Sequence, residues 1–163
     1  MNLTSNSSYY RNFVFGVEDS LVSTVGLLSG IAVAGVTGQA ILATGTILIF
    51  VEAISMGAGS FLSESSAETY ERHRDDITKR PYWDALIMFI SYLISGFIPL
   101  FPYVILPAKA AFWTSIGLSL FVLLLLGLFG ARVSKTSPWR NMARMVLVGG
   151  CAIAIGSIVG RLF

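Results

Sequence analysis

The chain has 163 residues, of which 55% are hydrophobic and only 12% are charged, and its formal net charge is +2. An ordinary soluble domain carries about 25% charged residues, so this composition excludes a disordered chain and a nucleic-acid-binding protein. The single cysteine, Cys151, excludes a disulfide scaffold. A mean hydropathy of +0.75 indicates that the solvent of this chain is the lipid bilayer.

Five apolar stretches are each long enough to cross a bilayer core of about 30 Å as a helix. In chain order the predicted spans are 13–36, 39–62, 83–106, 109–131 and 142–162. The joints at 37–38 and 107–108 are very short, which predicts two antiparallel hairpins. The predicted fold class is therefore all-α, a polytopic membrane protein with five transmembrane helices. Residues 1–163 form a single transmembrane domain, in which 63–82 is a short cytoplasmic helical connection rich in acidic and basic residues.

The distribution of lysine and arginine predicts the orientation, because short cytoplasmic loops retain an excess of both. With five spans, nine of the eleven basic residues lie on one side of the membrane, and only Lys109 and Arg161 lie on the other. We therefore expect the N-terminus in the cytoplasm and the C-terminus outside. Within the first span, Gly26 and Gly30 lie on one helix face, and this spacing predicts close packing against another helix.

Three carboxylates fall within the predicted spans: Glu18 and Asp19 in the first and Glu52 in the second. An ionised carboxylate at the bilayer centre costs about 2.5 to 3.5 kcal/mol on insertion scales, so such a residue faces a partner, a cavity or an ion. No lysine or arginine lies deep within the predicted spans, so an internal salt bridge cannot neutralise all of these carboxylates. Their charges are then neutralised by protonation, by a bound cation, or by the two in alternation. A fourth acid, Asp84, begins the third span, where we expect it to lie in the membrane interface.

Helix geometry places Asp19 and Met56 at one depth, about 9 Å below the same membrane face. Glu52 lies one turn deeper than Met56 and on the same helix face. Oxygen ligands alone suit Mg²⁺, Ca²⁺ or Mn²⁺, whereas an added thioether favours a transition metal such as Fe²⁺. The predicted cargo is a divalent transition cation. Met56 is alternatively a core filler, and Glu18, which points about 100° away from Asp19, is alternatively directed to the membrane surface.

A stripe of carboxylates, Glu64, Glu68, Glu71 and Asp75, continues from the second span at helical spacing. The stripe is either a metal-collecting surface or a solvated helix face. In the second case it is held by pairs at four-residue spacing: Glu68 with Arg72, Asp75 with Lys79 and Asp76 with Arg80. The sequence has no phosphate-binding loop, no paired cysteines and no serine nucleophile motif. We therefore expect neither enzymatic activity nor a prosthetic group.

Four segments resemble the vacuolar iron transporter family, and the similarity extends from about residue 11 through the fifth span. They are FGVEDSLVST at 15–24, EAISMGAGSFL at 52–62, the glutamate-bearing segment 64–71 and IPLFPY at 98–103. The resemblance implies a five-span homodimer that moves Fe²⁺, and often Mn²⁺, out of the cytoplasm in exchange for protons. It also implies a pathway at the dimer interface, lined by the first two spans.

In that family the span-one aspartate corresponds to Asp19 and the span-two methionine to Met56. The chain departs from the family at position 48, where members usually carry a glutamate and this chain has Leu48. Its own acid in the second span is Glu52, one helical turn later. The cytoplasmic metal-gathering domain of longer members is reduced here to 64–76.

The leading prediction is a homodimeric metal exporter in which Asp19 and Glu52 alternate between protonation and metal binding, helped by Met56. Its expected partners are Fe²⁺ or Mn²⁺, protons, a second copy of the chain and the lipid bilayer. The membrane is the cell membrane in a prokaryote or an organelle membrane in a eukaryote. Two alternatives stay open: a structural or assembly protein whose acids only bond across helices, and a passive cation channel.

Overall fold

The computed structural model describes residues 3–73 and 78–163, and this part of the chain contains helices and no strand. The helices are α1 (Leu3–Val33), α2 (Gly38–Arg72), α3 (Arg80–Leu100), α4 (Pro102–Ile105), α5 (Ala108–Ser134) and α6 (Pro138–Gly160). Within the described residues, five helical segments are long and apolar enough to cross a membrane, with α3 and α4 together forming the third. The five predicted spans are thus confirmed, and the chain is an integral membrane protein.

The helices extend beyond the apolar stretches from which the spans were predicted. α1 begins at Leu3 although the first predicted span begins at residue 13, and α2 continues to Arg72 although the second span ends at residue 62. Hydropathy marks the part of a helix that crosses the membrane, whereas the backbone hydrogen bonds continue into water. α2 ends where His73 adopts the left-handed conformation (φ 51°) and donates its backbone N–H to the Thr69 carbonyl over 2.9 Å.

The third span is broken into two helices near its end. α3 contains Pro99 and ends at Leu100, and α4 begins at Pro102. Proline lacks a backbone N–H, and its ring clashes with the preceding helical turn, so two prolines three residues apart interrupt the helix. This break reorients the chain just before the connection to α5.

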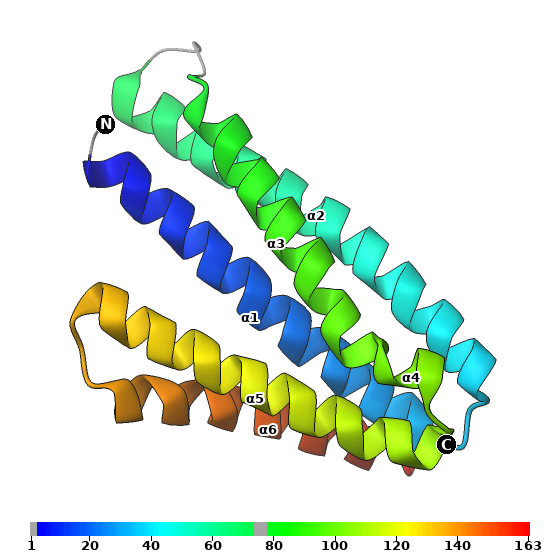
Figure 1. Ribbon diagram of the computed structural model, residues 1–163. Coiled ribbons are helices and arrows are strands. Elements are labelled where there is room, and N and C mark those ends of the chain that lie inside the picture. Colours follow the sequence, from blue (N-terminus) through cyan, green and yellow to red (C-terminus); the bar gives the residue numbers. More distant parts are fainter. Residues whose placement is uncertain (1–2, 74–77) are drawn as a thin grey trace.

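Different connections between helices lie at the two ends of the bundle (Figure 1). One end holds the beginnings of α1 and α3, the end of α2 and the α5–α6 connection. The opposite end holds the α1–α2 connection, α4 and the C-terminus. The termini therefore lie at opposite ends of the bundle, as an odd number of membrane crossings requires.

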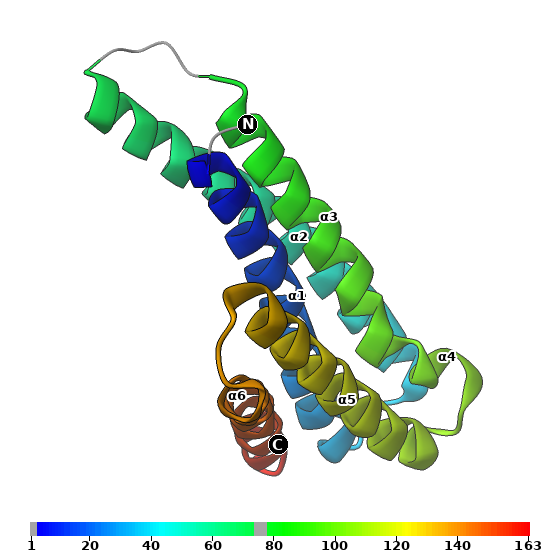
Figure 2. The same cartoon turned by 60° about the vertical axis from the view of Figure 1, so that its left-hand side comes forward.

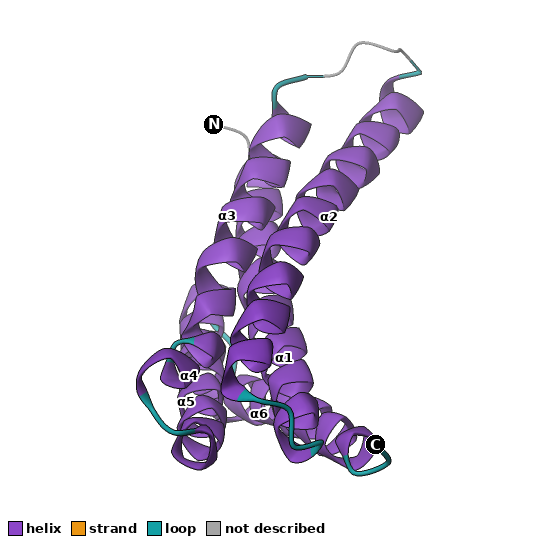
Figure 3. Cartoon of the chain, turned by 90° about the vertical axis from the view of Figure 1, so that its right-hand side faces the viewer, coloured by secondary structure: helices purple, strands orange, loops and turns teal. Residues whose placement is uncertain are grey.

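α1 lies between the α2–α3 pair and the α5–α6 pair (Figures 1 and 2). The two short joints do connect antiparallel helices, but α1 and α2 each pack mainly against α3 rather than against each other. Figure 3 shows α2 and α3 running alongside each other from the connection between them. The region where α1 and α2 both approach α3 holds two of the three acids predicted within the spans, as described below.

Glycines bring α1 and α6 into close contact. A Cβ atom added to Gly156 would collide with the backbone of Gly26, and one added to Gly160 would collide with the backbone of Gly30. Each helix thus presents two glycines four residues apart to the other, an arrangement that lets backbones approach in membranes. The close packing predicted from Gly26 and Gly30 is confirmed, and its partner is α6.

Candidate metal site

A side-chain hydrogen bond sets the register between α1 and α2. Ser60 donates to the Asn12 amide oxygen over 3.1 Å. The two helices run antiparallel, so the seven-residue step from Asn12 to Asp19 on α1 nearly equals the eight-residue step from Ser60 back to Glu52 on α2. Asp19 and Glu52 therefore lie at one depth, close enough for their charges to interact.

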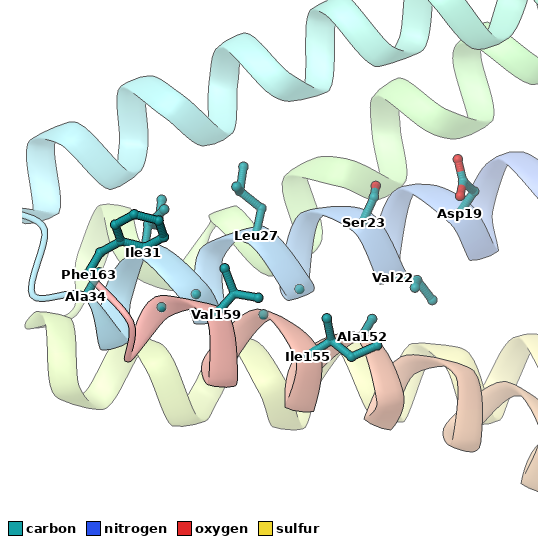
Figure 4. Close-up of a pocket in the computed structure, with 14 residues that line it drawn as sticks. Asp19, Val22, Ser23, Leu27, Ile31, Ala34, Ala152, Ile155, Val159 and Phe163 are labelled. Atoms are coloured by element: carbon teal, nitrogen blue, oxygen red, sulfur yellow. The ribbon is translucent and has the colours of Figure 1, made fainter.

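Both carboxylates are half-buried, and so is Glu18, whose charge also interacts with that of Asp19. Asp19 and Ser23, one turn apart, project from the side of α1 that faces away from α6 (Figure 4). Asp19 also forms the polar end of a cavity of about 640 Å³ along α1 and α6. Apart from Asp19 and Ser23, that cavity is lined by apolar side chains and glycines. Asp19 thus lies beside a largely apolar space, where an ionised carboxylate is poorly solvated and a nearby cation or a bound proton stabilises it.

A buried tyrosine completes the surroundings of the acid pair. Tyr92 of α3 is fully buried, and its hydroxyl oxygen lies 2.7 Å from the Ser23 hydroxyl oxygen. The charges of Asp19 and Glu52 both act on Tyr92. Sequence reasoning missed this residue. The available signal was a side chain with a polar end in an otherwise apolar span, since a buried tyrosine hydroxyl usually finds a hydrogen-bond partner.

Met56 lies about one turn closer to the N-terminal end of the bundle than Glu52, and it lines a second cavity of about 480 Å³. This second cavity contains two thioethers, because Met88 of α3 lines it as well. The other lining residues are Arg11, Asn12, Phe15, Gly59, Ser60, Ser63 and Glu64. Asp19 is not among them, and the Asn12–Ser60 register places Asp19 closer in depth to Glu52 than to Met56. The difference arises because the Asn12–Ser60 register, and not the ends of the apolar stretches, sets the relative height of the two helices.

Glu64 lies at the rim of the second cavity and forms ion pairs with two arginines. Its side chain is only 11% exposed, and it pairs with Arg11 of α1 and, over 3.4 Å, with Arg80 of α3. The three helices are therefore linked by charge at the end of the bundle that holds the N-terminus. In this arrangement Glu64 neutralises arginines and does not join the Asp19–Glu52 pair.

Asp84, near the start of the third span, takes part in the same polar layer. Its side chain is fully buried within the protein. One carboxylate oxygen accepts hydrogen bonds from Ser8 over 2.9 Å and from Asn12 over 2.7 Å, and the other lies 3.7 Å from the Arg80 Nε. α1 extends beyond its apolar stretch and carries Ser8 and Asn12 with it, so these residues cover Asp84.

The described acids of the predicted carboxylate stripe have different surroundings. Glu68 accepts hydrogen bonds from the Thr78 backbone N–H over 3.1 Å and from the Thr78 hydroxyl over 2.8 Å, whereas Glu71 is exposed. Asp75 and Asp76 lie outside the described residues, as does the Arg72 side chain, so their predicted pairs do as well. Within residues 3–73 and 78–163, no three histidine, cysteine, aspartate or glutamate side chains lie close enough to hold a metal ion together.

Comparison with known proteins identifies the family. The model of the VIT family matches residues 10–80 and 71–161. This chain belongs to the VIT family. The resemblance carried by the four sequence segments is thereby confirmed.

Curated relatives of this VIT-family chain are similar over most of its length. Vacuolar iron transporter 1 of Arabidopsis thaliana is 22% identical, over 88% of this chain and 82% of that protein. Vacuolar iron transporter 1 of Tulipa gesneriana is 23% identical, over 88% and 83%. Vacuolar iron transporter homolog 5 of Oryza sativa subsp. japonica is 26% identical, over 100% and 84%. These identities are low, so the choice of candidate site residues in this VIT-family chain depends on the geometry of the chain itself.

Proposed function

We propose that this protein is a homodimeric membrane transporter that exports a divalent transition metal, Fe²⁺ and also Mn²⁺, from the cytoplasm in exchange for protons. The observation that carries the proposal is the Asp19–Glu52 pair, two carboxylates whose charges interact inside a membrane-spanning bundle. Among the described residues, the ion pairs of lysine and arginine do not reach either acid. Neighbouring carboxylates in a low-dielectric site cannot both stay ionised without a counter-charge. A proton and a metal ion therefore compete for the same pair, and this competition is what proton–metal exchange requires.

The homodimer is proposed because one chain supplies only part of a metal site. A transition cation takes four to six ligands, whereas the described part of one chain brings together no group of three potential ligands of the acidic, histidine or cysteine type. Two copies related by a two-fold axis would contribute two Asp19–Glu52 pairs to one pathway. The first two helices are suited to this role, because they leave both acids half-buried.

The direction of transport is proposed from the distribution of charge between the two ends of the bundle. The end with the N-terminus carries most of the basic residues, and short cytoplasmic segments retain such an excess. These residues are Arg11, Lys79, Arg80, Arg132, Lys135, Arg140 and Arg144. The cavity that contains Met56 and Met88 lies toward this end, and we propose that it admits metal from the cytoplasm. Iron is favoured as the cargo by the two thioethers and by the names of the relatives.

Transport is tested with the purified full chain in sealed liposomes. We expect flux of Fe²⁺ and Mn²⁺ that accelerates when protons can flow down their gradient in the direction opposite to the metal. The flux should slow when a protonophore collapses the proton gradient. Metal flux that is insensitive to the gradient would indicate the passive channel. An absence of flux from folded, dimeric protein would contradict transport and favour the structural alternative.

The thioether of Met56 should matter more for Fe²⁺ than for Mn²⁺. In Met56→Leu we expect the KM for Fe²⁺ to rise about 10-fold and the KM for Mn²⁺ to change less than about 2-fold, because sulfur is a better ligand for the softer metal. Leucine conserves volume, so the packing of α2 should be preserved. Met145→Leu, in the half-buried part of α6, is the matched control. Equal effects on both metals would show that Met56 contributes packing rather than a ligand.

A further inference from the structure

The connection between α5 and α6 carries a group of basic residues that have no acidic neighbour in the sequence. The last acidic residue of the chain is Asp84, far before the connection. The group, called here the basic patch, consists of four exposed side chains: Arg132, Lys135, Arg140 and Arg144. The ion pairs among the described residues involve none of the four. The patch therefore presents four positive charges that no described acid neutralises.

Hydrogen bonds hold the backbone of the patch in a defined turn. α5 ends where Lys135 adopts the left-handed conformation (φ 51°), and the Ala131 carbonyl accepts from the backbone N–H groups of Lys135 and Thr136. The Asn141 side-chain amide donates to the Thr136 hydroxyl over 3.1 Å, which ties the turn to the beginning of α6. The basic residues thus belong to a hydrogen-bonded corner between two helices rather than to a free loop.

The basic patch lies where two spans leave the membrane. α5 and α6 are both apolar enough to cross a bilayer, and the turn between them lies at the same end of the bundle as the beginning of α1 (Figure 1). Trp139, next to Arg140, is 78% exposed. Tryptophan is enriched where the bilayer meets water, at the level of the lipid headgroups. The charges of the patch are therefore expected at the level of the lipid phosphates.

One exposed face of α6 continues from the basic patch into the membrane. Arg140 and Arg144 are one turn apart, and helix geometry places a run of exposed apolar residues below them on the same face. This run, called here the apolar stripe, consists of Leu147, Cys151, Ile155 and Ile158. The face thus has charges at one end and an apolar surface along the rest of its length, which is the layout of a phospholipid.

The packing of α6 leaves the apolar stripe uncovered. Gly149 approaches Leu123 of α5, whereas Gly156 and Gly160 approach the backbone of α1. At 100° per residue these three glycines lie on the side of α6 opposite the stripe. The contacts that hold α6 in the bundle therefore do not use the face that continues from the basic patch.

The charges of this face favour a lipid over a second copy of the chain as its occupant. A two-fold interface brings the same surface of both copies together, so the basic patches would approach each other without an acid to separate them. An anionic phospholipid instead supplies the missing negative charge, and its acyl chains cover the stripe. Basic clusters at the membrane surface attract such lipids.

We propose that the basic patch binds the phosphate headgroup of an anionic phospholipid, whose acyl chains lie along the apolar stripe of α6. Arg140 and Arg144 hold the headgroup from above the stripe, and Arg132 and Lys135 add charge from the end of α5. This lipid site is separate from the acid pair and does not depend on metal transport.

The test measures the lipid preference of the purified full chain. Titration with phosphatidylglycerol or phosphatidylcholine in detergent, followed by native mass spectrometry, gives a Kd for each lipid. We expect the wild type to bind phosphatidylglycerol at least about 10-fold more tightly. Combining Arg140→Gln with Arg144→Gln should weaken phosphatidylglycerol binding about 25-fold, because each basic residue near the surface contributes about 5-fold. Its affinity for phosphatidylcholine should not change.

Two further variants separate charge at this place from charge in general. Combining Arg140→Lys with Arg144→Lys keeps both charges and should retain the lipid preference within about 3-fold. Combining Lys109→Gln with Arg161→Gln removes two exposed cations from the opposite end of the bundle, and the lipid preference should equal that of the wild type. Equal binding of the two lipids by the wild type, or an unchanged preference in the Arg140→Gln and Arg144→Gln protein, would overturn the proposal.

The remaining outcomes assign the face to another occupant. Inorganic phosphate at the same concentration should not displace phosphatidylglycerol, and displacement would show that the patch binds a free anion instead. Cys151 is exposed on the apolar stripe, so an added oxidant would join two copies through Cys151 if a second copy covered this face. We expect no such disulfide in liposomes that contain phosphatidylglycerol, and its efficient formation would overturn the lipid site. None of these measurements uses metal flux, so their failure leaves the proposed transport untouched.

Discussion

Asp19→Asn should reduce proton-driven metal flux by at least about 100-fold while leaving a folded protein. Residues that merely support a metal ligand cost about 10- to 100-fold in affinity when they are mutated, and Asp19 is proposed as a ligand itself. Asparagine has the size of aspartate but cannot ionise, so it neither balances a cation nor exchanges a proton. The measurement is Fe²⁺ flux into proteoliposomes with and without a pH gradient, at matched protein content.

The thermal stability of Asp19→Asn separates loss of function from loss of fold. Asp19 is half-buried and its charge is repelled by those of Glu52 and Glu18. Removing one of these like charges should therefore leave the unfolding temperature in detergent unchanged or higher. Glu71→Gln is the matched control, because Glu71 is an exposed acid of the same bundle, and it should retain full flux. Normal flux in Asp19→Asn would support the structural or assembly alternative for these acids.

The sequence was sufficient for the spans, and it singled out Asp19 and Glu52 as candidates, because both arguments depend on the bilayer. Twenty apolar residues form a helix where water is absent, because the backbone polar groups must then be satisfied internally. A carboxylate such as Asp19 or Glu52 costs free energy in the same place, so its presence there suggests a function. These arguments need no knowledge of which helices touch. They therefore predicted five helices without revealing that α3 packs against both α1 and α2.

The remaining features depend on helix contacts and on register, which hydropathy does not contain. The relative depth of Asp19 and Met56 was estimated from the ends of apolar stretches, whereas the Asn12–Ser60 hydrogen bond fixes it in the structure. Tyr92 lies near α1, where its hydroxyl contacts Ser23, because α3 packs against both α1 and α2. For the same reason, the carboxylate stripe could not be resolved from spacing alone into an ion-paired Glu64 and an exposed Glu71.

Asp84 is a second feature that depends on a helix contact. The sequence places this aspartate at the start of an apolar stretch but does not show which residues surround it. In the structure, the polar first turns of α1 cover it, so that the carboxylate lies among Ser8, Asn12 and Arg80. Asn12 also accepts from Ser60, and Asp84 therefore orients the residue that sets the register between α1 and α2.

Asp84→Ala should destabilise the protein by about 3 kcal/mol, because it leaves two buried donors without an acceptor and removes one of the two carboxylates that pair with Arg80. Arg80 is 39% exposed, so solvation and its pairing with Glu64 offset part of the lost ion pair. Asp84→Asn keeps an oxygen that can accept from Ser8 and Asn12, and should cost about 1 kcal/mol. Reversible unfolding in mixed detergent measures both values. Because Asn12 would lose its anchor, Asp84→Ala should also lower metal flux at temperatures where it remains folded. Equal stability of Asp84→Ala and the wild type would mean that the buried layer does not hold α1 against α3, and that the register of Asp19 and Glu52 is fixed elsewhere.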